Sequence, residues 1–93
     1  MMVQLHLPAS QSLKDKRQVV KSLQARLQNQ FGVAVAEVGE LQHWQTAELG
    51  ITCVANETRH ADQVLDSAIR FIEETRPDLE ILNLVRETAS YFS

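Results

Sequence analysis

The feature that most constrains this chain is a long amphipathic run from Leu13 to about Gln30. Its apolar residues recur at helical spacing and form one face: Leu13, Val20, Leu23, Leu27 and Phe31, with Val19 on the margin. Ser12 precedes the run as an N-cap, with Asp15 three residues later, and Gly32 follows it as a C′ residue. A helix with one apolar face needs another layer to cover that face, so the remaining segments must supply it.

The segments around this helix alternate between strand and helix patterns. Strands are expected at 2–7, 33–38, 47–55 and 79 to about 87, and a second helix is expected from a cap at Asn56 or Thr58 to Pro77. This order predicts an α+β, ferredoxin-like β-α-β-β-α-β sandwich, in which two helices cover one face of a four-stranded antiparallel sheet. We expect a single domain over residues 1–93, with 88–93 as a frayed tail.

Composition places the chain among ordinary globular proteins. Hydrophobic residues make up 44%, charged residues 23%, and the net charge is −3. Cys53 is the single cysteine, so no disulfide framework is expected. The first residues do not resemble a signal peptide, and no apolar run reaches transmembrane length. We therefore expect a cytoplasmic protein without a membrane partner.

Several motifs in this chain resemble those of a known family. They are SLKDKR at 12–17, VAEV at 35–38, WQ at 44–45, Ala47, and LG at 49–50. In this order they are similar to the bacterial YlxP-like family, catalogued as domain of unknown function 503, over about residues 5–84. The resemblance implies a ferredoxin-like fold and work related to RNA or the ribosome, and it supplies no catalytic residues. The chain departs from the family in a shorter first strand and in Thr46, where a basic residue is expected.

The strongest candidate for a binding surface is a set of positive charges on the first helix. The run holds five of the chain's nine basic residues and one acidic residue. Lys14, Arg17 and Lys21, called here the basic stripe, fall beside the apolar face, with Gln24 and Gln28 as hydrogen-bonding neighbours. The alternative is a solvated helix face. The second helix carries charges of both signs, whereas the stripe carries positive charge alone. This difference favours contact with RNA, ribosome-associated factors or an acidic partner.

Three other features carry weaker expectations. Lys16 falls on the apolar face, and in the first turn we expect it to snorkel past the end of the sheet. Trp44 either anchors a partner or closes one end of the core. The strand at 33–38 lies at a sheet edge, where it either pairs with a second copy to form a homodimer or is covered by a loop of its own chain.

The sequence shows no arrangement typical of an enzyme or a metal site. His6, His43, His60 and Cys53 lie on separate elements without the spacing of metal ligands, and Cys53 is expected to be buried. The outward positions of the central strands carry no aromatic residue, so base stacking on the sheet is not expected. We therefore predict a non-enzymatic binding module without a cofactor. The alternative is a small-molecule-sensing or dimeric assembly domain that uses the second-strand edge and Trp44.

Overall fold

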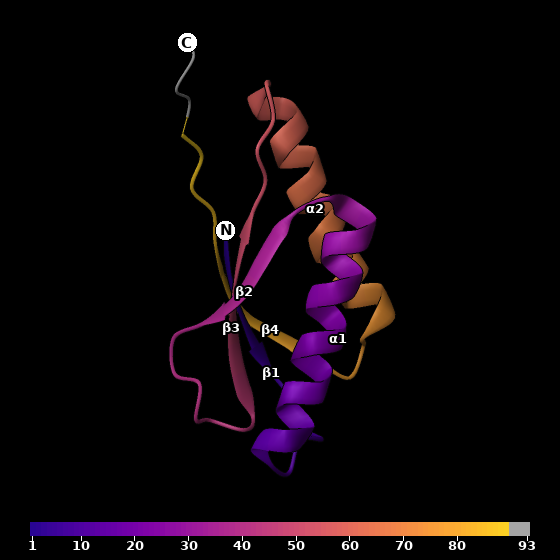
Figure 1. The fold of residues 1–93 in the computed structure, drawn as a ribbon, viewed down its shortest axis with the longest axis vertical. Coiled ribbons are helices and arrows are strands. Elements are labelled where there is room, and N and C mark those ends of the chain that lie inside the picture. Colours follow the sequence, from indigo (N-terminus) through magenta and orange to yellow (C-terminus); the bar gives the residue numbers. More distant parts are fainter. Residues whose placement is uncertain (90–93) are drawn as a thin grey trace.

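The fold follows the predicted order of strands and helices. The computed structural model describes residues 1–89 (Figure 1). Its elements are β1 (Met2–His6), α1 (Leu13–Phe31), β2 (Ala34–Val38), β3 (Thr46–Thr52), α2 (Thr58–Thr75) and β4 (Glu80–Val85). Thr88 and Ala89 belong to no helix or strand, and the rest of the expected frayed tail, 90–93, lies outside the described residues.

The four strands form one sheet in the order β2-β3-β1-β4. Every neighbouring pair is antiparallel. In this order β1 and β3 are central and β2 is an edge strand, as expected. Both helices cover the same face of the sheet (Figure 1). This arrangement confirms the predicted α+β, ferredoxin-like fold.

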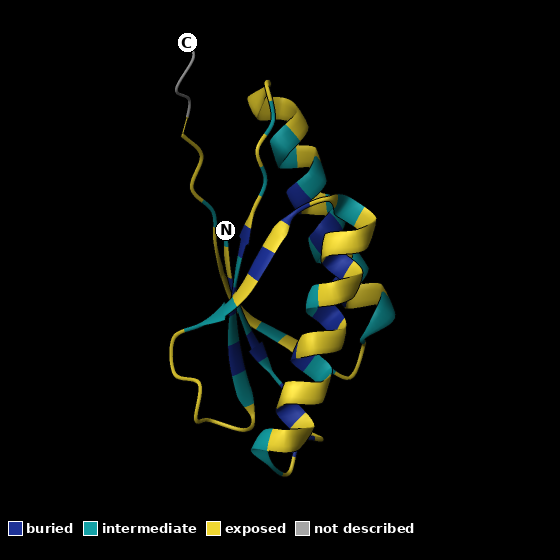
Figure 2. Ribbon diagram, in the orientation of Figure 1, coloured by how far each residue is buried: buried dark blue, intermediate teal, exposed yellow. Residues whose placement is uncertain are grey.

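The core lies between the sheet and the helices, where the buried positions of β1, β2, β3, α1 and α2 face inward (Figure 2). β4 has no buried position and packs the half-buried Ile81 against this core. Alternation along the strands supplies Val3, Leu5, Val35, Leu49 and Ile51, and helical spacing supplies Val20, Leu23, Leu27, Leu65, Ala68 and Ile72. The predicted apolar face of α1 is thus the face that the sheet buries.

The caps of α1 confirm the sequence signals, whereas the cap of α2 does not. Ser12 Oγ accepts a hydrogen bond from the Asp15 N–H at 3.1 Å. Gly32 adopts a left-handed φ of 64° and its N–H donates to the carbonyl of Gln28. The prediction that Asn56 or Thr58 caps α2 is wrong, because the backbone is still extended at Glu57, which is the N-cap and makes no side-chain cap bond.

Two strands end earlier than expected. β4 covers Glu80–Val85 and contains a register shift opposite β1, where Leu82 is an extra residue between two paired positions and is 51% exposed. β3 ends at Thr52, so Cys53 lies just beyond the strand and is half-buried instead of buried.

Candidate functional site

The three cations of the basic stripe lie together on the exposed side of α1. Lys14, Arg17 and Lys21 are all exposed. With a rise of about 1.5 Å per residue, the stripe extends about 10 Å along the helix axis. None of the ion pairs within residues 1–89 involves these three side chains. The structure therefore presents them to solvent as one patch of a single sign.

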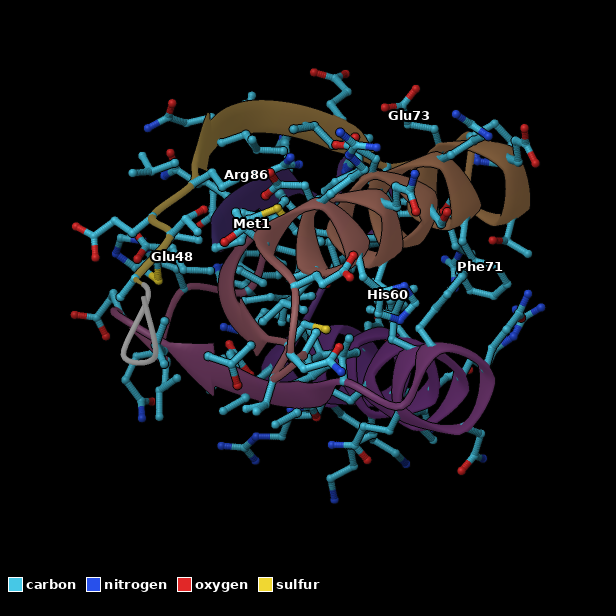
Figure 3. The ribbon with its side chains drawn as sticks, turned by 90° about the horizontal axis from the view of Figure 1, so that it is seen from above. Met1, Glu48, His60, Phe71, Glu73 and Arg86 are labelled. Atoms are coloured by element: carbon cyan, nitrogen blue, oxygen red, sulfur yellow. The ribbon has the colours of Figure 1, made fainter. Side chains whose placement is uncertain are left out.

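Another exposed cation of α1 serves a different contact. The guanidinium of Arg26 lies 5.1 Å from the centre of the Phe71 ring, and Phe71 meets Phe31 edge to face at 5.6 Å. Figure 3 shows Phe71 between the two helices. Arg26 thus belongs to the α1–α2 contact.

The two glutamines predicted beside the stripe contact the sheet. The side-chain amides of Gln24 and Gln28 both donate to the carbonyl of Val35, at 3.4 and 3.3 Å. Val35 belongs to edge strand β2, so this side of α1 borders the edge of the sheet. The structure therefore brings the basic stripe and the β2 edge side by side, and it gives the two glutamines a role in covering that edge.

Lys16 is enclosed by the protein, and the expectation that it snorkels to solvent is wrong. Its side chain is 0% exposed. Its ammonium donates to the carbonyls of Leu41 at 2.9 Å and Thr46 at 3.3 Å, and it lies 2.9 Å from Glu37 Oε2. The contact with Glu37 is a close ion pair and not a directed hydrogen bond. Leu41 lies in the loop 39–45, Thr46 is the first residue of β3 and Glu37 belongs to β2. These three acceptors surround the ammonium, which is why the lysine stays inside.

The same loop carries two exposed apolar side chains. Leu41 is 47% exposed and Trp44 is 46% exposed, so Trp44 does not close the core. Besides the Lys16 contacts, Gln45 Nε2 donates to the carbonyl of Ser10 at 3.2 Å, and the Leu7 N–H donates to the carbonyl of Gln45 at 2.8 Å. These bonds hold the loop against the segment that opens α1. Lys16 on an apolar face was the one sequence signal of this attachment.

The sheet face opposite the helices offers a different kind of surface. A hollow of about 190 Å³ there is lined mainly by Met2, Gln4, Glu48, Asn83 and Val85. Glu48 extends on the side of the sheet away from the helices (Figure 3). Within residues 1–89, no strand contains phenylalanine, tyrosine or tryptophan, and His6 at the end of β1 is the one ring side chain on these strands. This face therefore lacks the paired aromatic residues on which an RNA-recognition motif stacks bases.

A larger hollow lies beside the start of α2. It measures about 290 Å³ and is bordered by Cys53, the first turn of α2 and residues 87–89. Within the described part of the chain, no group of three or more histidine, cysteine or carboxylate side chains is placed to hold a metal ion. Neither helix, over the residues described, is long and apolar enough to span a membrane.

Comparison with known proteins gives consistent matches. Residues 1–86 match the model of a family described as "Protein of unknown function (DUF503)". The "Uncharacterized protein YlxP" of Bacillus subtilis (strain 168) is 35% identical over 69 residues, which cover 74% of each chain. The motifs identified above lie within the residues that the family model matches. The chain therefore belongs to the YlxP-like family of proteins of unknown function.

Proposed function

We propose that this protein is a non-enzymatic binding module of the cytoplasm that contacts RNA, alone or within ribosomal particles, through the basic stripe. The carrying observation is that Lys14, Arg17 and Lys21 are exposed and form no ion pair within residues 1–89. By contrast, Arg76 and Arg86 each lie within 3 Å of a carboxylate. Cations left without an internal partner are available to the phosphates of a polyanion.

The charge of the whole protein sets how such binding would occur. The net charge is −3, so the molecule as a whole does not attract a polyanion. We therefore expect the attraction to centre on the stripe, whose three cations lie within about 10 Å along α1, while the acidic residues elsewhere disfavour contact through other faces. The expected result is weak binding with a defined orientation. A polyanion that approached another face would meet the acidic residues there and be repelled.

Salt dependence follows from the number of cations. If the three cations contact phosphates of a single strand, log K falls with log salt with a slope of about −2. Affinity should then fall about 20-fold between 50 and 200 mM salt.

The test is a paired charge reversal. Arg17→Glu/Lys21→Glu should remove salt-sensitive binding to RNA and to ribosomal subunits, measured by fluorescence anisotropy and co-sedimentation. The matched control is Arg59→Glu/Arg70→Glu, because both arginines are exposed on α2 and the charge change is the same. Wild-type protein without salt-sensitive binding, or an equal loss in both variants, contradicts the proposal. Binding to acidic protein that exceeds binding to RNA identifies the stripe as a site for an acidic partner.

A second candidate function rests on the exposed loop. Trp44 and Leu41 are exposed on the loop that follows edge strand β2, which suits a small-molecule-sensing domain or an assembly domain that forms a homodimer. This candidate has less support, since the amides of Gln24 and Gln28 already occupy the carbonyl of Val35 on that edge. Light scattering over a range of protein concentrations, with Trp44 fluorescence followed across a metabolite panel, tests it. A concentration-independent monomer with unchanged fluorescence contradicts it.

A further inference from the structure

We infer that the nucleic acid bound by the basic stripe is single-stranded, and that Trp44 stacks on a base of that same strand. This inference rests on the proposed function and adds a partner class to it. It begins with an indole that the fold leaves 46% exposed. An exposed indole on a loop that is fastened to the protein is a preformed apolar surface. Little conformational freedom is therefore lost when a ligand covers it.

The loop is fastened where α1 begins. Lys16, in the first turn of α1, holds the carbonyl of Leu41, three residues before Trp44. Gln45, the residue after Trp44, holds the carbonyl of Ser10 two residues before the α1 cap. Trp44 therefore lies close to the end of α1 that carries Lys14, and a short ligand can reach both.

This neighbourhood favours a single strand over a duplex. Along a single strand the phosphates alternate with bases whose faces are free, so cations and an aromatic ring side by side can each find a partner. A duplex keeps its bases stacked inside and offers mainly phosphates and sugars at its surface. The cations alone would suit a single strand or a duplex. Trp44 favours the single strand, because only there is a base face free to stack on the indole.

Lys16 acts here as a positioning residue. It is 0% exposed and cannot touch a bound strand. It holds the loop from inside through the carbonyls of Leu41 and Thr46. The stripe extends about 10 Å along α1, so with Trp44 at its N-terminal end the site suits a segment on the order of four nucleotides.

Trp44 is the chain's single tryptophan, so its fluorescence reports on this site alone. Single-stranded RNA of about eight nucleotides should quench it on binding. Inorganic polyphosphate has phosphates without bases, so it should bind the stripe with little quenching. Trp44→Ala should weaken binding of the RNA about 5- to 150-fold and leave polyphosphate binding unchanged. Trp44→Phe should keep most of the affinity, because phenylalanine also stacks.

Leu41→Ala is the matched control, because it removes a side chain of similar exposure from the same loop. It should change the affinity for the RNA less than Trp44→Ala does. Circular dichroism of each variant checks the fold, which an exposed substitution should leave intact.

The outcomes separate this inference from the proposed function. One outcome overturns the inference alone. In it, RNA binding is salt-sensitive and is lost in Arg17→Glu/Lys21→Glu, but RNA does not change Trp44 fluorescence and Trp44→Ala binds RNA with the affinity of wild type. Duplex RNA or a polyglutamate peptide bound as tightly as the single strand also overturns it. Wild-type protein that binds neither RNA nor polyphosphate overturns the proposed function, and the inference with it.

Discussion

Replacement of Lys16 by methionine should destabilise the protein by about 3 kcal/mol. Methionine fills similar space but removes the ammonium from Glu37 Oε2 and from the carbonyls of Leu41 and Thr46. Loss of one member of a buried ion pair costs about 3–5 kcal/mol, since the other charge is left without compensation. The Glu37 side chain is 17% exposed, so water relieves part of this cost and places the estimate at the lower end. For a domain of this size, about 3 kcal/mol lowers the melting temperature by about 12–24 °C.

The assay is urea denaturation followed by circular dichroism, for wild type, Lys16→Met, Glu37→Met and the double variant. The double variant should lose less stability than the sum of the two single variants, by about 1–3 kcal/mol, because the second substitution removes the charge that the first one stranded. Lys14→Met is the control, since this exposed lysine lies in the same turn, and it should change stability by less than about 0.5 kcal/mol. A cost below about 1 kcal/mol for Lys16→Met, or strict additivity in the double variant, would refute the reasoning.

Three further predictions follow from other parts of the structure. Gly32→Ala should cost about 1–2 kcal/mol in thermal denaturation and Gly32→Asn less, because φ is 64° and no atom within 4 Å would clash with an added Cβ. The side-chain hydrogen bond from Arg76 lowers the pKa of Asp78, so this pair stabilises the fold above about pH 4 and the contribution is lost as pH falls further. Because the pair is partly exposed, Asp78→Asn should lower the free energy of unfolding by less than about 1 kcal/mol at pH 7. In denaturation experiments at low pH, the variant and wild type should have nearly equal stability. Gln24→Ala/Gln28→Ala uncovers the β2 edge and should increase self-association in sedimentation velocity, whereas an unchanged monomer would show that these amides do not protect the edge.

Features set by local chemistry could be predicted from the sequence. Ser12 and Gly32 mark the ends of α1 because a cap depends on a few neighbouring residues. The order of strands and helices along the chain could be predicted from the alternation of apolar and polar residues in the strands and from the apolar faces of the two helices. The ends of β3 and β4 were harder to predict, because a strand stops where its partner stops. Thus Cys53 lies beyond the last pair, and Leu82 is an extra residue that no single-strand pattern reveals.

The candidate surface was predicted in part for the same reason. A helical wheel places Lys14, Arg17 and Lys21 on one side, and the structure agrees. The wheel does not say which neighbour that side borders, so it could not show that Gln24 and Gln28 both reach the carbonyl of Val35 in β2. That contact depends on how the helix crosses the sheet, which is a tertiary property.

The buried ion pair raises the question of why this core position holds a charge. Two well-packed apolar side chains could replace Lys16 and Glu37 without desolvating any charge, and such replacements are often neutral or stabilising. An apolar pair could not, however, bind the carbonyl of Leu41 in the loop or that of Thr46 at the start of β3, where the loop ends. The contribution of Lys16 is therefore to the position of the loop more than to overall stability. In the Lys16→Met/Glu37→Met variant, stability should recover towards wild type while the fluorescence anisotropy of Trp44 falls. Recovery of both would show that packing alone holds the loop.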